Sequence, residues 1–324
     1  MISSRFPPQS GSDTVRPCAS NVITMTQDNN IQSQWTVNRV MAFCQTHFEK
    51  HKLESPRLFA ELILSHVLHL PRIQVYAQHR REMSPQELAR TKELVKRAIA
   101  HEPIQYLTGK APFFGHEFVV TPDVLIPRGD TETLVEQALM HLKSLAMTEP
   151  PRVLDVCTGS GCVGLSIAKQ VKNVQLTASD LSAKAVDVAK QNAAMLKLED
   201  RTTFLVGDLF APLSGRVDPS KFHVIVSNPP YIATGQMATL DQNVRDYEPR
   251  LALDGGADGL DFYRRLVAGA IEHLAPGGRL VVEIGFDQAD RVVEFFDSAS
   301  AYAEVKMTRD LHKNPRVVGG TMTA

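Results

Sequence analysis

The stretch RVLDVCTGSGC, residues 152–162, decides the fold of this chain. Its apolar beginning predicts a short buried strand, and the apolar run that follows, residues 163–169, predicts a helix. A strand that passes through a glycine turn into a helix places backbone N–H groups and the positive end of a helix dipole at one point. Gly159 and Gly161 leave room for a ligand against the backbone, where a Cβ would collide. Taken alone, this pattern fits any nucleotide-binding α/β fold.

A second predicted strand, residues 174–180, ends on an acidic residue, Asp180. This carboxylate lies about 20 residues after the glycine turn, where an acid accepts the ribose hydroxyls in dinucleotide-binding folds. Asp180 could instead cap the helix that follows from Ser182. The two roles are compatible, and both stay open at this point.

A third predicted strand, residues 222–227, runs into Asn228-Pro229-Pro230-Tyr231. Ligand-facing residues belong at the carboxyl ends of parallel strands. The prolines stiffen the turn and remove N–H donors, so the carbonyls around them stay free to accept hydrogen bonds. With the side-chain oxygen of Asn228, the turn offers two acceptors to an NH2 group, and Tyr231 offers a flat face to a planar group or a sulfonium cation. A tight Pro-Pro turn that merely closes a strand is the alternative. The order of the motifs favours the first interpretation.

Length and composition set limits on the class of protein. The 324 residues suggest two domains, and 43% hydrophobic with 22% charged residues are typical of a soluble globular chain. Lys plus Arg (35) nearly balance Asp plus Glu (36), so we expect no direct nucleic-acid binding, although a local basic patch stays possible. Four scattered cysteines argue against a disulfide framework or a zinc site and favour the reducing cytoplasm. No apolar run reaches the roughly 18 residues of a membrane span, so no membrane association is expected.

The texture of the sequence predicts four regions. Residues 1–34 have the composition of a disordered extension. Residues 35–108 show helical periodicity, with Ser84-Pro85-Gln86-Glu87 as a helix start, and predict a helical substrate-recognition domain. Residues 109–127 predict a β-hairpin linker, and 128–324 an α/β domain that contains the glycine turn and the Asn-Pro-Pro-Tyr turn. The histidines of the helical region are assigned to surface or packing positions, so no metal is expected.

The remaining elements complete an α/β prediction. Periodicity and glycine stops predict two further helices, at 259–274 (with a stop at 277–278) and 286–296, and strands at 279–284, 302–308 and 317–320. The expected fold is a seven-stranded, mostly parallel sheet with helices on both faces, a Rossmann-like arrangement, preceded by a helical bundle.

The motifs LDVCTGSG, ASD, GDLF and SNPPY, in this order, resemble a class I methyltransferase acting on an amino or amide nitrogen. Further segments resemble the HemK family, and within it the protein-(glutamine-N5) methyltransferases that modify class I peptide-chain release factors. These segments are HEPIQYLTG (101–109), VTPDVLIPRGDTETLVE (120–136), YEP (247–249), RDL (309–311) and NPRVV (314–318). The resemblance covers roughly residues 35–320.

The resemblance implies S-adenosylmethionine as the cofactor and the glutamine of a Gly-Gly-Gln loop as the acceptor. It assigns the cofactor's methionine part to the glycine turn, its ribose to Asp180, and its adenine to Asp208 and Leu209. It implies that Asn228 touches cofactor and acceptor and, with Pro229, performs the catalysis without a separate general base. The cofactor-binding residues are then Cys157, Thr158, Gly159, Ser160, Gly161, Asp180, Asp208, Leu209 and Asn228, and the acceptor-binding residues are Asn228, Pro229, Pro230 and Tyr231.

Two positions depart from the family pattern. Cys157 stands where relatives commonly have glycine, and Gly129 follows Ile-Pro-Arg where proline is frequent. A cysteine at this position resembles the pattern of the sister enzyme that acts on a glutamine of a large-subunit ribosomal protein. Methylation of that glutamine is therefore one alternative function. An adenine-N6 nucleic-acid methyltransferase and a non-catalytic binding module are others. A nicotinamide dehydrogenase is disfavoured because the NPPY turn has no role in one.

Overall fold

The computed structural model describes residues 34–145, 148–214 and 221–323. Every helix and strand below belongs to one compact unit, Thr36–Ala324. The predicted disordered extension, residues 1–34, lies outside the described residues except for Gln34. Within the described ranges, no helix combines the length and the apolar character that crossing a membrane requires.

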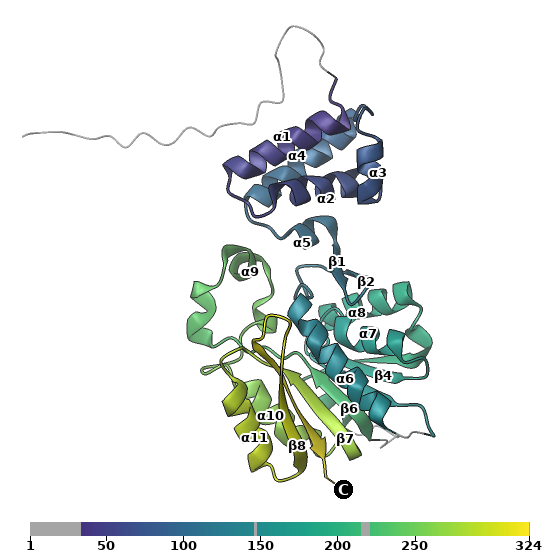
Figure 1. The fold of residues 1–324 in the computed structure, drawn as a ribbon, viewed down its shortest axis with the longest axis vertical. Coiled ribbons are helices and arrows are strands. Elements are labelled where there is room, and N and C mark those ends of the chain that lie inside the picture. Colours follow the sequence, from purple (N-terminus) through teal and green to yellow (C-terminus); the bar gives the residue numbers. More distant parts are fainter. Residues whose placement is uncertain (1–33, 146–147, 215–220, 324) are drawn as a thin grey trace, which may run out of the picture. The chain divides into compact units, whose positions relative to one another are not determined.

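The first part of this unit is helical, as predicted (Figure 1). The sequence Ser84 to Glu87 forms the predicted capping box: the Ser84 hydroxyl accepts from the Glu87 N–H at 3.2 Å, and the Glu87 carboxylate accepts from the Ser84 N–H at 2.8 Å. Apolar side chains from several helices, among them Phe48, Ile63 and Leu94, are fully buried. The helices are α1 (Val37–Lys50), α2 (Pro56–Leu68), α3 (Arg72–Ala77), α4 (Pro85–Ile99) and α5 (Ile104–Thr108).

A hairpin follows the helices, as the Phe-rich alternation predicted. Strands β1 (Lys110–Phe113) and β2 (His116–Val119) pair antiparallel. The side chain of Asn192, on α8 (Ala183–Leu196), accepts from the backbone N–H of Val119 at 2.7 Å and donates to its carbonyl at 3.0 Å. The hairpin is thereby fastened to a helix of the main sheet.

The main sheet has seven strands in the order β5-β4-β3-β6-β7-β9-β8, which confirms the predicted seven-stranded, mostly parallel sheet. The pairs among β5, β4, β3, β6 and β7 are parallel, whereas β9 pairs antiparallel with both β7 and β8. The strands are β3 (Arg152–Val156), β4 (Gln175–Asp180), β5 (Thr202–Val206), β6 (Phe222–Ser227), β7 (Leu274–Glu283), β8 (Tyr302–Arg309) and β9 (Pro315–Met322).

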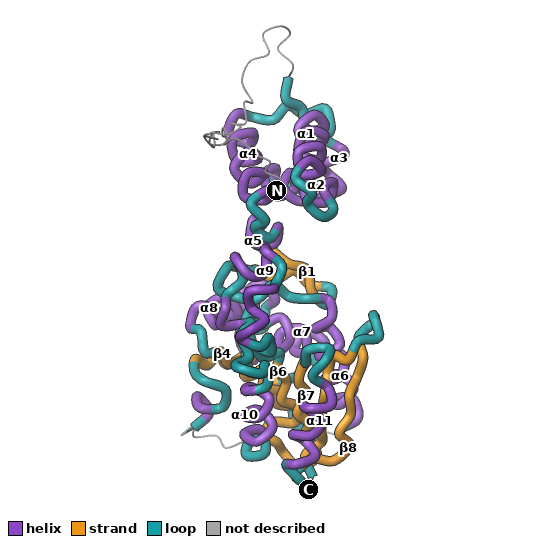
Figure 2. The backbone as a smooth tube through the Cα atoms, turned by 90° about the vertical axis from the view of Figure 1, so that its left-hand side faces the viewer, coloured by secondary structure: helices purple, strands orange, loops and turns teal. Residues whose placement is uncertain are grey.

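Helices cover both faces of this sheet (Figures 1 and 2). Alternate strand residues point to opposite faces, so Val224 and Val226 enter one core while Ile225 between them enters the other. The first core is covered by α6 (Glu132–Ser144), α7 (Cys162–Gln170) and α8, and the second by α10 (Asp261–Ala270) and α11 (Ala289–Ser298). Because both faces are buried, the central strands are mostly apolar.

One predicted boundary is wrong. The helix expected at 259–274 occupies only Asp261–Ala270, and β7 begins at Leu274 and passes through the two glycines that were expected to end the helix. Gly277 has a left-handed φ of 73°, and a Cβ on Gly278 would lie 2.9 Å from the Phe222 carbonyl oxygen. The pairing of β6 with β7 is irregular at this point. Gly278 therefore allows a close strand approach and Gly277 a left-handed backbone within β7, and neither ends the helix.

Candidate functional site

A cavity of about 190 Å³ opens at the carboxyl ends of the parallel strands. The chain leaves β3 toward β4 on one side and later forms β6 on the other, so a crevice develops beside β3. Residues following β3, β4, β5 and β6 line it. Nine of the predicted site residues do so: Cys157, Thr158, Gly159, Ser160, Asp180, Asp208, Leu209, Asn228 and Pro230.

Three predicted site residues are not among those that line this cavity. Gly161 faces the protein, because a Cβ there would lie 2.8 Å from Cδ1 of Leu165 on α7. Pro229 is buried. Tyr231 packs against the core under α10 and α11, and its burial raises the pKa of its hydroxyl to about 12.

The glycine turn and the second strand are joined by the Asp180 carboxylate. One oxygen accepts the Gly159 N–H and the other the Ser182 N–H, each at 2.9 Å. Helix α8 is capped by the Ser182 hydroxyl, which accepts from the Ala185 N–H at 3.2 Å, so the cap is Ser182 itself. Burial raises the pKa of Asp180, and these backbone hydrogen bonds oppose the rise.

Cys157 begins the turn in a left-handed conformation with φ of 61°. Only glycine adopts this region without steric cost, which explains why glycine suits the position. The departure noted in the sequence is therefore a locally strained residue at the edge of the cavity.

A further acid at the cavity, Asp155, received no role from the sequence. Its buried carboxylate accepts from the Thr158 hydroxyl at 2.6 Å and from the Gly164 N–H at 3.0 Å. Burial raises its pKa to about 7. An acid within an otherwise apolar strand was the available signal, since such a group needs a reason to be buried.

The Asn228 side chain is held from behind by two groups that sequence reasoning also missed. Its Nδ2 donates to the Thr131 hydroxyl at 3.3 Å. Glu283, the last residue of β7, is buried beside both, and hydrogen bonds from Thr131 and Asn228 oppose a burial that raises its pKa to about 7. The signal was again an acid closing an apolar strand.

Two segments quoted for the family resemblance line the cavity together. One runs from Pro122 to Arg128, and the other, Tyr247 to Pro249, contributes Pro249. They are joined through the Glu248 side chain, which is fully buried, forms an ion pair with Arg128, and accepts from the Ile126 N–H at 3.3 Å. These residues had no assigned role in the sequence.

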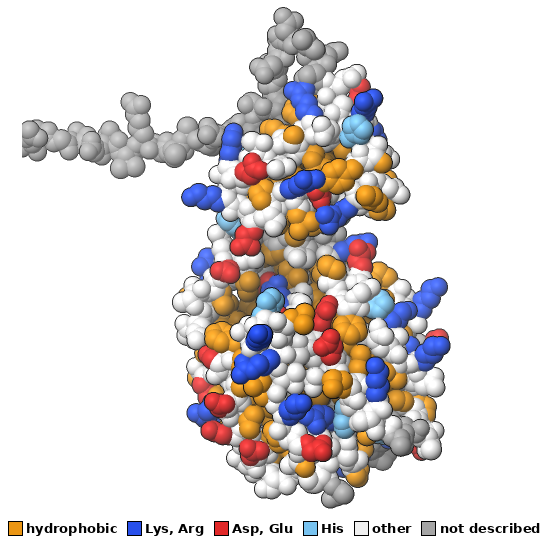
Figure 3. All heavy atoms as spheres, viewed as in Figure 1, with side chains coloured by type: hydrophobic (Ala, Val, Ile, Leu, Met, Phe, Trp, Pro, Cys, Tyr) orange, Lys and Arg blue, Asp and Glu red, His pale blue; other side chains and the backbone are white. Residues whose placement is uncertain are grey.

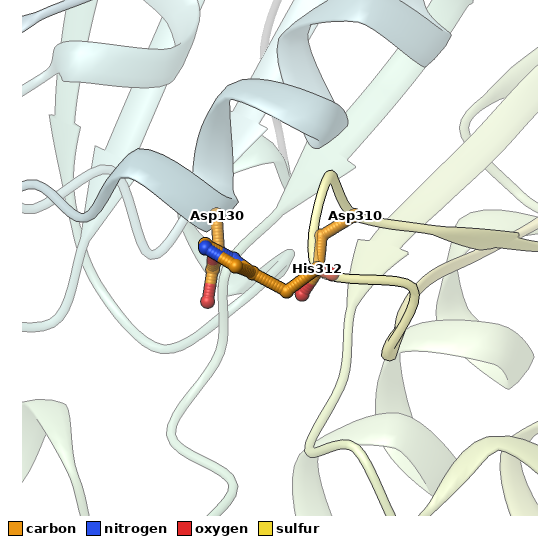
Figure 4. Close-up of side chains that lie close together, drawn as sticks. All are labelled: Asp130, Asp310 and His312. Carbon is orange, nitrogen blue, oxygen red and sulfur yellow. The ribbon is translucent and has the colours of Figure 1, made fainter.

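Among the described residues, one group approaches the spacing of a metal site: Asp130, Asp310 and His312 (Figure 4). The Arg316 guanidinium lies 3.1 Å from a carboxylate oxygen of both acids. It supplies the positive charge that a cation would otherwise bring, so the group is an ion-pair network. It joins the turn between β8 and β9 to the 3-10 helix η1 (Gly129–Thr131).

The surface carries no broad field of one sign on the face seen in Figure 3, where basic and acidic side chains are interspersed. This agrees with the near balance of 35 basic and 36 acidic residues.

Two family models match this chain. The family described as "PrmC N-terminal domain" matches residues 40–109, and "Methyltransferase small domain" matches residues 134–256. A release factor glutamine methyltransferase of Geobacter sulfurreducens is 42% identical over 286 residues, covering 88% of this chain and 96% of that protein. Namesakes from Koribacter versatilis (40%, covering 85% and 94%) and Chlorobaculum tepidum (36%, covering 87% and 96%) are also similar. The class I methyltransferase fold expected from the motifs is thus confirmed, the protein is an enzyme of methyl transfer, and the chain belongs to the release factor glutamine methyltransferase family.

Proposed function

We propose that this enzyme uses S-adenosylmethionine to methylate the side-chain amide nitrogen (N5) of a glutamine, in the Gly-Gly-Gln loop of class I peptide-chain release factors. The observation that carries the proposal is that Asn228 and the glycine turn line one cavity. The relatives are named release factor glutamine methyltransferases, and the match covers nearly the whole length of each. Their names support a release factor as the acceptor.

The residues of the cavity fit S-adenosylmethionine. A Cβ on Gly159 would meet nothing within 4 Å, so a ligand can lie directly against the backbone of the turn. Carboxylates of Asp180 and Asp208 suit ribose hydroxyls and a cationic ligand, while Leu209 and Phe262 add apolar surface. When bound, this cofactor supplies a methyl group on a positively charged sulfur.

The chemistry of an amide explains the need for the Asn-Pro-Pro-Tyr turn. An amide nitrogen is a poor nucleophile because its lone pair is delocalised into the carbonyl. We propose that Asn228 Oδ1 and the Pro229 carbonyl accept hydrogen bonds from the two N–H groups of the substrate glutamine and hold its nitrogen in line for attack on the methyl group. Pro230 and Tyr231 would shape the slot that holds the glutamine side chain. These hydrogen bonds strengthen as positive charge develops on the nitrogen, which stabilises the transition state more than the ground state. No general base is needed, because the proton becomes acidic once nitrogen is tetrahedral.

We assign a role to each region that the sequence predicts. Residues 35–108 would recognise the acceptor protein, 109–127 would link the two parts, and 128–324 would bind the cofactor and catalyse. The glycine turn from Cys157 to Gly161 would hold the methionine part of the cofactor. The cytoplasm, where translation takes place, is the proposed location.

The substrate is tested by incubating purified enzyme and S-adenosylmethionine with a class I release factor and measuring the mass of its peptides. A gain of about 14 Da on the glutamine of the Gly-Gly-Gln loop is expected, and a release factor with alanine at that glutamine should gain nothing. If the intact release factor stays unmodified while another acceptor is methylated, the proposed acceptor is wrong.

Asn228→Ala should lower the turnover of that reaction by about 10²–10³, comparable to removing one preorganised polar group from an active site. Cofactor affinity measured by calorimetry should change far less, because the residue acts mainly on the acceptor. Near-normal turnover of the purified variant would contradict the mechanism.

Cys157 supports one alternative acceptor, a glutamine of a large-subunit ribosomal protein, because the cysteine resembles the sister enzyme. Adding that protein and duplex DNA to the same assay separates the three possibilities. The DNA arm tests adenine-N6 methylation, which would need a basic tract along the nucleic acid. We expect the release factor to be the preferred acceptor.

A further inference from the structure

The buried end of β7 carries a charged group that the proposed mechanism does not use. Glu283 is 2% exposed, and its Oε2 finds no hydrogen-bond partner among the residues that the structure describes. An isolated buried carboxylate is costly, and replacing it with an apolar side chain would usually help stability. Its presence therefore calls for a role beyond packing.

The sheet places Glu283 beside Asn228. Ser227, the last residue of β6, pairs with Val282 of β7. The residues that follow these two are Asn228, directly after β6, and Glu283, the last residue of β7. Thr131, at the end of η1, completes the group from the other side. Three elements distant in sequence thus meet behind one amide.

The hydrogen bonds within this group are directional. Asn228 Nδ2 donates to the Thr131 hydroxyl at 3.3 Å. Both side chains lower the pKa of the adjacent Glu283 carboxyl group, as donors directed toward a carboxylate do. A carboxylate can only accept, so its neighbours must present donors to it. The NH2 end of the Asn228 amide is held on this side, which leaves the oxygen end free.

We infer that Glu283 is a positioning residue for methyl transfer: its carboxylate, together with the Thr131 hydroxyl, holds the NH2 end of Asn228 so that the Asn228 oxygen faces the acceptor amide. This inference rests on the proposed function, in which that oxygen accepts a hydrogen bond from the acceptor. A reversed Asn228 amide would present a donor to another donor, and the acceptor would lose its alignment.

The arrangement depends on Glu283 being ionised, because a protonated carboxyl group could donate to Asn228 and favour the reversed amide. Burial raises the Glu283 pKa to about 7. The titratable and charged groups that face it, from η1, α7, the turn after β6, α10 and β9, are Asp130, Cys162, Tyr231, Tyr263 and Arg316. The turnover number should therefore rise with pH through about 7.

The decisive experiment measures kcat and KM for methylation of the release-factor glutamine between pH 6 and 9 in four proteins: wild type, Glu283→Gln, Asn228→Ala and the double variant. Glu283→Gln should lower kcat about tenfold, the loss of one charge-assisted hydrogen bond, with KM unchanged and the rise near neutral pH flattened. In the double variant, kcat should be no lower than in Asn228→Ala alone, because Glu283 acts through Asn228.

Two controls make each outcome informative. Glu294→Gln changes an exposed glutamate on α11 and should leave kcat and its pH profile unaltered. Thr131→Val probes the same amide from the other side and decides the matter if Glu283→Gln does not fold, since it too should lower kcat without adding to Asn228→Ala. Unchanged kcat, or losses that multiply with those of Asn228→Ala, would overturn the inference. Absence of activity in wild type would instead overturn the proposed function.

Discussion

At the scale of single residues, the two glycines of the turn have different duties although they are two positions apart. A Cβ on Gly159 would meet no protein atom within 4 Å, whereas one on Gly161 would meet Leu165 Cδ1 at 2.8 Å. Gly159 lines the cavity and Gly161 does not. One glycine therefore leaves space for a ligand, and the other lets helix α7 pack against the turn.

This difference predicts that the same substitution affects mainly cofactor binding at one position and mainly stability at the other. Gly159→Ala should weaken S-adenosylmethionine binding at least tenfold while costing about 1–2 kcal/mol of stability, the penalty for a left-handed alanine. Gly161→Ala carries the same penalty and adds overpacking of about 1–3 kcal/mol, so it should lower the melting temperature more. Calorimetry with the cofactor and thermal unfolding measure the two effects. Equal loss of affinity at equal stability would show that the glycines are interchangeable.

At the scale of elements, an ion pair between Arg128 and Glu248 joins two loop segments beside the cavity. Arg128 precedes η1, and Glu248 follows α9 (Gln242–Tyr247). The Glu248 side chain is fully buried while that of Arg128 is 39% exposed, so the carboxylate relies on its partner for charge compensation. Removing the partner of a buried charge is more harmful than removing both charges.

Arg128→Met should therefore destabilise the protein by about 3–5 kcal/mol, and the double variant Arg128→Met with Glu248→Gln should recover much of that loss. Both variants should bind S-adenosylmethionine more weakly, because the two segments line the cavity. Urea denaturation and calorimetry give the two quantities. A double variant as unstable as Arg128→Met alone would mean that the charge of Glu248 is not the cause.

At the scale of the whole molecule, the sheet contains two buried carboxyl groups, Asp155 on β3 and Glu283 at the end of β7. Burial raises the pKa of each to about 7. Asp155 lines the cavity, and Glu283 lies beside Asn228, which also lines it. The cost of burying these two groups therefore falls on the residues that form the site. The pH dependence of unfolding should record this.

The sign follows from proton binding. Between about pH 4 and pH 7 the folded protein keeps a proton on Glu283 that the unfolded chain releases, so this group's contribution to stability is complete below about pH 4 and is lost as pH rises to about 7. The unfolding free energy of wild type minus that of Glu283→Gln should fall by at most about 4 kcal/mol across this window and then stay level. Urea denaturation at a series of pH values measures it. A difference that does not vary with pH would show that Glu283 titrates normally.

The amino-acid sequence by itself determined the sheet and the location of the cavity. Apolar runs at 152–156 and 222–227, glycines after the first and prolines after the second are local signals, and parallel strands bring their carboxyl ends to one edge whatever the details. The Ser84–Glu87 capping box was equally local, and it formed as predicted.

Only the tertiary structure decided what stands behind those residues. Thr131, Asn228 and Glu283 meet from positions far apart in the sequence, and so do Arg128 and Glu248. Spacing along the chain carries no information about such contacts. The passage of β7 through Gly277 and Gly278 likewise depended on the approach of β6. Local periodicity sets the elements, but burial and pairing between distant elements set which polar groups are held at the site.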